Sequence, residues 1–199
     1  MAVRHDPIAK QCRDFDLSPA VLGYDKKTTN RHPGANTRRR VSEYGLQLKE
    51  KQKLKFIYGV QETQFAHYYE IAEKQAGITG ENIIKLLERR LDNVVFRMGM
   101  AKTRREARQL VRHAHFRVNG KKVNIPSLLL KAGDVVTVKD SSRSTAKFKE
   151  LVELAETRLS PSWLEVDKEN CKATLKSLPI REELDYEVNE QLIVELYSK

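Results

Sequence analysis

Arginine and lysine side chains are unusually dense between residues 85 and 122 of this 199-residue chain. Twelve basic residues stand against three acidic ones there, while the net charge of the whole chain is +10. Arginine outnumbers lysine in this stretch, which favours forked hydrogen bonds to phosphate oxygens. A run of charges is often only a solvated surface. Because these charges fall on one side of a predicted helix and of a predicted hairpin, we expect a nucleic-acid interface.

Two predicted helices carry the first of these charges. In the first, apolar residues recur at helical spacing from Leu87 through Leu91 to Met98. Gly99 tolerates the left-handed backbone that often follows a helix, so the helix should end there. We expect one helix that runs without a break from about Thr79 to Met98.

A second helix is predicted to begin at Thr103, which forms the T-x-x-E pattern of a capping box with Glu106. Its apolar residues fall on one side of a 3.6-residue wheel. Arginines gather on the adjacent side of the same wheel: Arg105, Arg108 and Arg112, with Arg104 at the edge. The helix should therefore bury one side and present the arginine side to an anion.

A β-hairpin follows, because Asn119-Gly120 is a strong signal for a two-residue turn in which both residues have positive φ. This turn pairs Val118 with Lys121 and Arg117 with Lys122. Strand alternation should place four apolar side chains on one face: Phe116, Val118, Val123 and Ile125. On the other face Arg117 opposes Lys122, and like charges across a ladder destabilise it unless an anion neutralises them. A further strand is expected over residues 135–139.

The segments RLDNVVFRMG, TRREARQLV and VNGKKVNI resemble the small RNA-binding module named after the fourth protein of the small ribosomal subunit. Outside the module, PGANTRRRVSEYGLQLKEKQKLKFIYG, WLEVD and NEQLIVELYSK are similar to the bacterial family of that protein. The resemblance runs from about residue 32 to residue 199. It implies that the module is inserted into a helical domain, to which the C-terminal helix returns.

The expected fold class is α+β. Residues 42–88 form a mainly helical domain completed by a helix of about residues 188–199, and residues 89–187 form the RNA-binding domain, with its core module at about 89–140. Ser42 should cap the first long helix. Three tyrosines in the helical domain could stack on unpaired bases, although helical spacing favours a place in the core: Tyr58, Tyr68 and Tyr69.

Residues 1–41 are expected to form an extended basic arm that orders only against a partner, because they contain little apolar surface to offset ordering entropy. A flexible solvated arm is the simpler alternative. Family members often bind zinc here through four cysteines, but only Cys12 lies in this region. The resemblance is therefore to the zinc-free branch, and we expect no metal and no cofactor.

Composition excludes several classes of function. There is no apolar run long enough for a membrane span and no secretory signal, and two distant cysteines suit a reducing compartment, so we expect a cytoplasmic protein. No phosphate-binding loop, dinucleotide fingerprint or nucleophile elbow is present. The pair His113 and His115 has a spacing that points the rings apart on a helix. We expect no active site.

The resemblance implies a structural constituent of the small subunit that binds small-subunit (16S) rRNA first and nucleates assembly of the body. It also implies contact with the fifth small-subunit protein, a role in translational accuracy, and contact with messenger RNA where it enters, through Arg38, Arg39 and Arg40. The expected RNA-binding residues are Arg38, Arg39, Arg40, Lys49, Lys51, Lys53, Lys55, Arg89, Arg104, Arg105, Arg108, Arg112, Arg117, Lys121 and Lys122.

Two alternatives stay open at this point. An RNA-modifying enzyme or a synthetase can carry the same module, but the rest of this chain has no catalytic motif. A general nucleic-acid or stress-related binding protein could use the module alone, but the long match outside the module argues against it.

Overall fold

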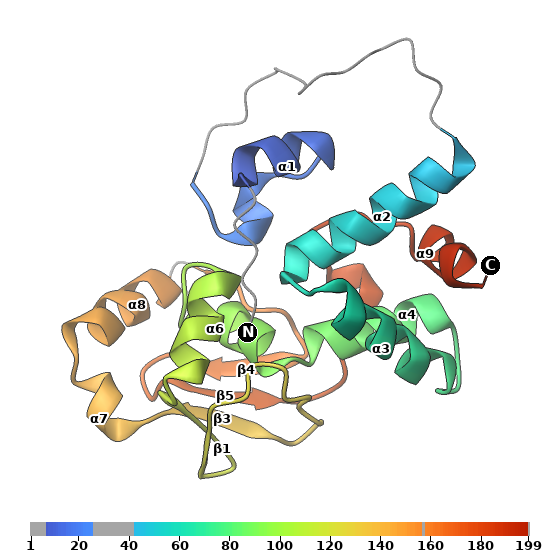
Figure 1. Ribbon diagram of the computed structural model, residues 1–199. Coiled ribbons are helices and arrows are strands. Elements are labelled where there is room, and N and C mark those ends of the chain that lie inside the picture. Colours follow the sequence, from blue (N-terminus) through green and yellow to red (C-terminus); the bar gives the residue numbers. More distant parts are fainter. Residues whose placement is uncertain (1–6, 26–41, 157, 199) are drawn as a thin grey trace. The chain divides into compact units, whose positions relative to one another are not determined.

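The chain separates into two units in a computed structural model, which describes residues 7–25, 42–156 and 158–198 (Figure 1). The described residues up to Ile83 and from Leu184 onward belong to unit 1. Unit 2 comprises the described residues from Ile84 to Glu183. The sequence predicts the corresponding borders after residues 88 and 187, so each observed border lies a few residues earlier.

Unit 1 is helical. Its elements are α1 (Ile8–Asp14), the 3-10 helix η1 (Pro19–Leu22), α2 (Glu43–Tyr58), α3 (Glu62–Glu73), the first half of α4 (Thr79–Glu88) and α9 (Glu190–Tyr197). Ser42 caps α2 as predicted, since its Oγ accepts a hydrogen bond from the Gly45 N–H at 3.2 Å.

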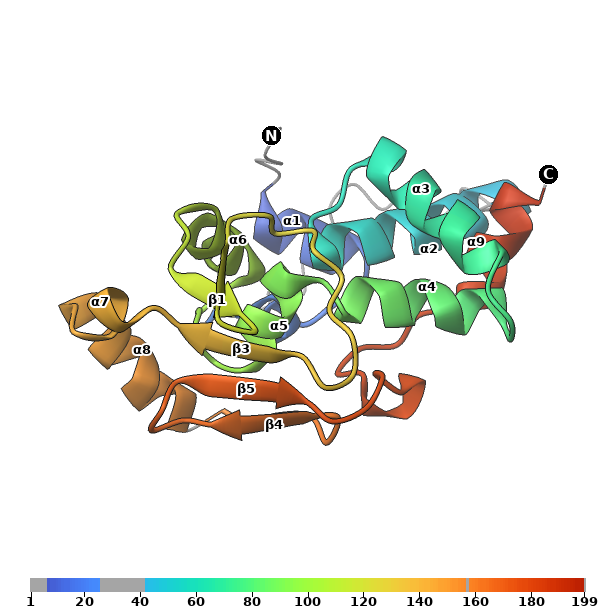
Figure 2. The same cartoon turned by 90° about the horizontal axis from the view of Figure 1, so that it is seen from below.

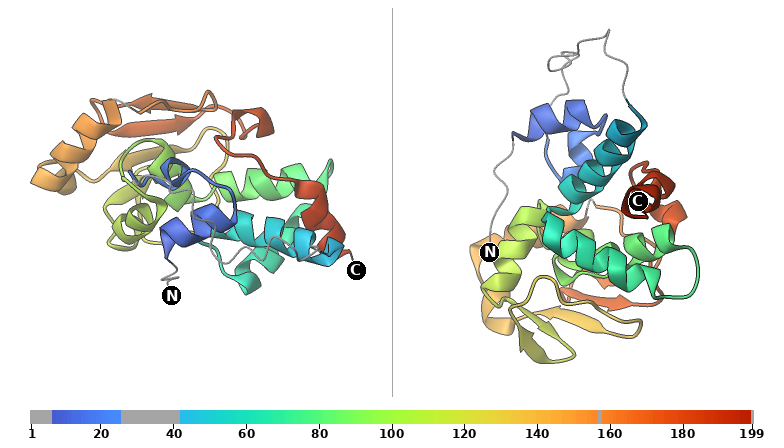
Figure 3. Two further views of the ribbon diagram at one scale, coloured as in Figure 1. Left: turned by 90° about the horizontal axis from the view of Figure 1, so that it is seen from above. Right: turned by 45° about the vertical axis from the view of Figure 1, so that its right-hand side comes forward.

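The C-terminal helix α9 lies beside α2, as both views of Figure 3 show for the dark red and cyan helices. Gln47 of α2 donates a hydrogen bond to Glu195 of α9 at 3.2 Å. The hydroxyl groups of Tyr58 and Tyr186 lie 2.7 Å apart in a buried contact. The last residues of the chain therefore complete the core of the first helical unit.

The expectation of an extended arm is wrong for residues 7–25, which form α1 and η1. Cys12, Phe15 and Leu17 are buried, and the Phe15 ring lies 5.6 Å from the Phe56 ring of α2 between centroids. The apolar residues of this short stretch are thus sufficient to cover part of α2. Residues 26–41, including the predicted contacts Arg38, Arg39 and Arg40, lie outside the described residues.

Unit 2 contains an antiparallel sheet with the strand order β2-β1-β3-β5-β4, which Figure 2 shows from below. The strands are β1 (Phe116–Val118), β2 (Lys121–Val123), β3 (Val135–Val138), β4 (Leu164–Asp167) and β5 (Lys172–Leu175). The helices are α5 (Leu91–Arg97), α6 (Arg104–Arg112), α7 (Asp140–Arg143), α8 (Ala146–Glu156) and the 3-10 helix η2 (Arg181–Glu183). This mixture confirms the predicted α+β class.

The predicted hairpin is confirmed in its register. Arg117 pairs with Lys122 and Val118 with Lys121, while Asn119 and Gly120 have φ values of 49° and 76°. The predicted alternation does not extend to Ile125, which is 55% exposed. Strand β2 ends at Val123, so the alternation that would bury Ile125 stops before reaching it.

The core of unit 2 is built from one face of the sheet together with α5, α6 and α8. Alternate residues of β1, β3 and β5 are buried, as period-two side-chain direction requires. Its largest fully buried side chains include Phe116, Phe148 and Leu91. Each contributes about 1.5–3 kcal/mol through the hydrophobic effect. Gly99 closes α5 with a φ of 86°, and a Cβ there would lie 2.7 Å from the Cβ of Ala155.

The predicted continuous helix is interrupted, and this expectation is wrong. Between α4 and α5, Arg90 has an extended backbone with a ψ of 137° and forms an isolated β-bridge with Leu129. The Leu91 N–H donates to the Leu128 carbonyl at 2.9 Å, and the Leu130 N–H donates to the Arg89 carbonyl at 2.9 Å. The backbone groups of residues 89–91 thus form hydrogen bonds with the segment before β3, and a continuous helix would have needed the same groups for its own hydrogen bonds.

Candidate nucleic-acid interface

Helix α6 presents one side to the core and another to solvent. Thr103 caps it as predicted, with its Oγ1 accepting a hydrogen bond from the Glu106 N–H at 3.2 Å. Ala107 and Val111 face the core and are fully buried, whereas Arg105 and Arg112 are exposed. The amphipathic pattern therefore sets which arginines can meet a partner.

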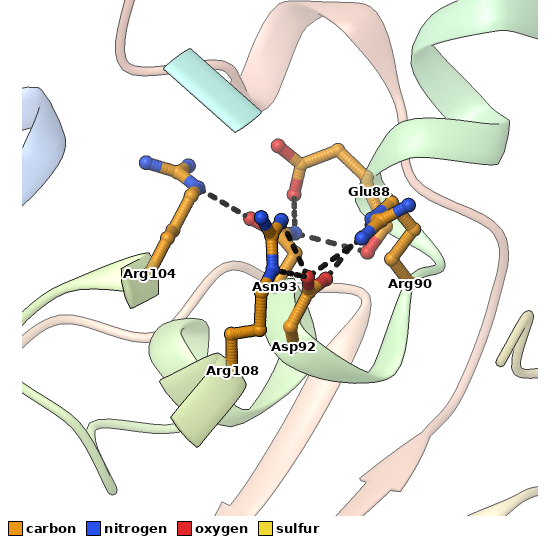
Figure 4. A network of polar contacts seen from close by, with 6 residues as sticks. All are labelled: Glu88, Arg90, Asp92, Asn93, Arg104 and Arg108. Atoms are coloured by element: carbon orange, nitrogen blue, oxygen red, sulfur yellow. Dashed lines mark hydrogen bonds and ion pairs between the residues drawn. The ribbon is translucent and has the colours of Figure 1, made fainter. Parts of the chain in front are cut away.

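The other two arginines of α6 point toward α5, as the close-up in Figure 4 shows. Arg104 is buried, and its Nε donates to the Asn93 Oδ1 at 2.8 Å while its guanidinium lies 4.4 Å from the centre of the Phe96 ring. Arg108 donates to the Asp92 Oδ2 through Nε at 2.9 Å and lies 2.8 Å from it through Nη2. These two side chains join α6 to α5.

Asp92 and its neighbours form a buried polar network around the start of α5 (Figure 4). Arg90, which is 1% exposed, donates to Asp92 through Nε at 3.0 Å and Nη2 at 2.7 Å. Asn93 donates to the Glu88 side chain at 2.8 Å, and Arg97 donates to the same carboxylate at 3.0 Å. Burial is tolerable for these charges because each meets an opposite charge with forked geometry.

The hairpin adds cations that lie at the surface and not in the buried network. Lys121 and Lys122 are exposed, and Arg117 is half-buried with its Nη1 3.8 Å from the Asp140 Oδ2. Four exposed cations of α6 and the hairpin form no ion pair with any residue that the structure describes, and we call them the open cations: Arg105, Arg112, Lys121 and Lys122. Their charges are available to an external anion.

Lysines of α2 in unit 1 are arranged differently. Lys51 and Lys55 both donate to Glu62, at 2.8 and 2.5 Å, and the Tyr197 hydroxyl donates to the same carboxylate at 2.9 Å. Burial alone would raise the pKa of Glu62, but these hydrogen bonds outweigh it and hold the pKa at about 2. Glu62 therefore keeps its charge, which offsets one of the two positive charges beside it and occupies both lysines with hydrogen bonds.

The three remaining predicted contacts that the structure describes on α2 and directly after α4 have weaker or different interactions. Lys53 is 4.0 Å from Glu50, Lys49 is exposed, and Arg89 donates to the Leu130 carbonyl at 2.7 Å. The tyrosines that could have stacked on bases are buried in unit 1: Tyr58, Tyr68 and Tyr69. The core interpretation of these rings is therefore correct.

Sequence reasoning missed Asp92 and Asn93, whose side chains hold the arginines of α6. The sequence does contain a signal for them, because Asp92 and Asn93 interrupt the apolar run that begins at Leu91 and continues with Val94. Buried polar residues need partners, so such an interruption predicts a polar network.

Within the described residues, no group of three or more His, Cys, Asp or Glu side chains is arranged to hold a metal ion. In the same part of the chain, no helix has the length and apolar character needed to cross a membrane.

Comparison with known proteins covers the whole chain. A family model described as the ribosomal protein S4/S9 N-terminal domain matches residues 4–88, and one described as the S4 domain matches residues 89–136. The small ribosomal subunit protein uS4 of Lachnospira eligens is 56% identical over 199 residues, which are 100% of both chains. The protein of the same name from Clostridioides difficile is 60% identical over 162 residues, or 81% of this chain and 78% of the relative.

Proposed function

Since the chain belongs to the S4 family of small-subunit ribosomal proteins, which are structural and not enzymatic, we propose that it binds small-subunit rRNA through the open cations of unit 2. The ribosome is the setting that this family implies, and the S4 domain is its RNA-binding part.

The observation that supports this surface is the separation of cations within one helix. Arg104 and Arg108 have partners on α5, whereas Arg105 and Arg112 have none among the described residues. Cations without a carboxylate partner bind phosphate and release counterions, which supplies most of the electrostatic affinity for RNA. A rigid helix and a hairpin present them at fixed positions, which suits recognition of a folded RNA by its shape.

The other predicted contacts contribute to RNA binding in different ways. Arg89, Arg108 and Arg117 flank the open cations, and Lys49 and Lys53 provide a second, weaker surface on α2. Lys51, Lys55 and Arg104 are left out, because intramolecular partners and burial occupy them. Their contribution to RNA binding is then indirect, through the packing that they stabilise.

We further propose the roles that the family resemblance implies. The protein binds the rRNA early, nucleates the body of the small subunit, contacts the fifth small-subunit protein and contributes to translational accuracy. Arg38, Arg39 and Arg40 contact messenger RNA where it enters the ribosome. These events take place on the ribosomes of the cytoplasm.

Chemical footprinting of naked small-subunit rRNA with the purified protein tests the proposal. At about 0.1 M salt we expect protection confined to one junction of helices, with affinity at least about 1,000-fold above that for an unrelated structured RNA; specific nucleic-acid binders typically reach this ratio. Equal affinity for both RNAs would favour a general nucleic-acid-binding protein and contradict the proposal.

A further inference from the structure

Asp92 places a buried negative charge inside the most basic part of the chain. Its side chain is 3% exposed and accepts hydrogen bonds from Arg90 on its own segment and from Arg108 on α6. Electrostatics alone would count this carboxylate as unfavourable for a surface that binds RNA, because it reduces the positive potential. Its hydrogen bonds indicate a second effect, on the orientation of α6.

Arg108 is the residue of α6 that lies between the two open arginines of that helix. It follows Arg105 by three positions and precedes Arg112 by four, so the three side chains are neighbours on the helix surface. The forked contact of Arg108 with Asp92 restricts rotation of α6 about its axis, and that rotation decides where Arg105 and Arg112 point.

A second contact one turn earlier reinforces the first. Arg104 of α6 donates to Asn93, the residue after Asp92, at 2.8 Å. Two anchors four residues apart are separated by about 6 Å along the helix axis, since the rise is 1.5 Å per residue. Anchors at this spacing oppose both sliding and rotation of α6 against α5.

We propose that Asp92 is a positioning residue for RNA binding, which holds α6 in the rotation that directs Arg105 and Arg112 at the rRNA without touching it. The inference rests on the proposed function, because it assumes that the open cations make the contact. It assigns to a buried acid a favourable effect on the binding of a polyanion.

The substitution Asp92→Asn tests this proposal, because charge and position predict opposite outcomes. The side chain keeps its size and the chain loses one negative charge, so a purely electrostatic role predicts tighter binding to rRNA. Loss of positioning predicts weaker binding, by about tenfold at 0.1 M salt. The log–log salt slope should also fall by about 0.7 to 0.9, the value of one lost phosphate contact.

Asp140→Asn is the matched control. Asp140 is 84% exposed in its side chain and lies 3.8 Å from Arg117, so the substitution removes one carboxylate from unit 2 without opening the buried network. We expect its affinity to equal or slightly exceed that of the unchanged protein. A loss in this control as large as that in Asp92→Asn would overturn the assignment of the effect to position.

Asp92→Glu separates positioning from folding. It keeps the charge but lengthens the side chain by one methylene in a buried site, so we expect a smaller loss, about threefold. All variants are measured well below their thermal midpoints, where circular dichroism shows full folding. Variants of reduced thermal stability that bind with unchanged affinity and salt slope when folded would make Asp92 merely structural and overturn the proposal.

The two proposals fail in different ways. If the unchanged protein binds small-subunit rRNA no better than unrelated RNA, the proposed function fails. If it binds specifically and Arg105→Gln with Arg112→Gln weakens it, yet Asp92→Asn binds as well or better, only the positioning role is overturned.

Discussion

Two regions of the chain are rich in basic residues but differ in the partners that the fold gives to those residues. Lys51 and Lys55 on α2 surround Glu62, while the open cations of α6 and the hairpin have no carboxylate partner among the described residues. A count of lysines and arginines does not distinguish the two regions. The difference lies in whether the fold brings a carboxylate from another helix to the cations.

The comparison shows that positive charge and availability to RNA are separate properties. A phosphate that approaches Lys51 or Lys55 must compete with a carboxylate already at hydrogen-bond distance, and Coulomb attraction at such distances is several times stronger near a protein surface than in bulk water. At the open cations the same phosphate displaces only mobile counterions. We therefore expect the two regions to respond very differently to substitution.

The largest expected effect comes from replacing all four open cations, Arg105, Arg112, Lys121 and Lys122, with glutamine. Affinity for small-subunit rRNA should fall on the order of 100-fold at about 0.1 M salt, and the log–log salt slope should fall by about 3, because four phosphate contacts are lost. Filter binding across a salt series measures both quantities, and circular dichroism checks the fold.

The matched variant in unit 1 is Lys51→Gln with Lys55→Gln. Because both lysines already donate to Glu62, we expect less than about a threefold loss of affinity and a nearly unchanged salt slope. A loss as large as that of the fourfold variant would show that the comparison between the regions is mistaken.

A smaller effect concerns acid stability in unit 1. The pKa of Glu62 is held at about 2 in the folded protein, below its ordinary value of 4.5, so its contribution to stability is complete above pH 4.5 and is lost as the pH falls toward 2. The Glu62 side chain is 48% exposed, so solvent screening limits this contribution to about 1 kcal/mol.

Urea unfolding of the unchanged protein and of Glu62→Gln at pH 6 and pH 3 measures this contribution. The difference in unfolding free energy between the two proteins should shrink at the lower pH, because the carboxylate of the unchanged protein is then mostly protonated in the unfolded chain. A difference that grows toward pH 3 would contradict the assignment of the low pKa to the folded state.

The substitution Glu62→Gln should also change RNA binding. Removing this carboxylate partly releases Lys51 and Lys55, so affinity for an unrelated structured RNA should rise by about threefold and the salt slope should steepen. The fourfold variant of unit 2 carrying the same change provides the control, since the gain should persist there. Unchanged binding would mean that Lys51 and Lys55 do not contact RNA even without the charge of Glu62, and would contradict the prediction.

Much of the local structure follows from short stretches of sequence. Asn119-Gly120 fixes the hairpin register because turn chemistry involves only neighbouring residues, and Thr103 with Glu106 sets the start of α6 for the same reason. Gly99 ends the preceding helix with positive φ. These signals need no knowledge of the rest of the fold.

Other features depend on residues far apart in the chain. The break at Arg90 requires carbonyl and amide groups of residues 128–130, which the helical pattern around Arg90 does not encode. Helix α1 was missed because its apolar residues are few, and Phe15, directly after it, packs against Phe56 of α2. The sequence counts Lys55 and Arg104 among the RNA contacts because it does not reveal their intramolecular partners. These partners, Glu62 and Asn93, lie on other helices.

The sequence by itself determined the α+β class, the family, the hairpin and the side of α6 that carries arginine, because periodicity and turn residues act over a few positions. The tertiary structure alone decided which cations remain open. An ion pair forms or not according to distances of a few ångströms between separate elements, and the order of residues along a chain does not contain those distances.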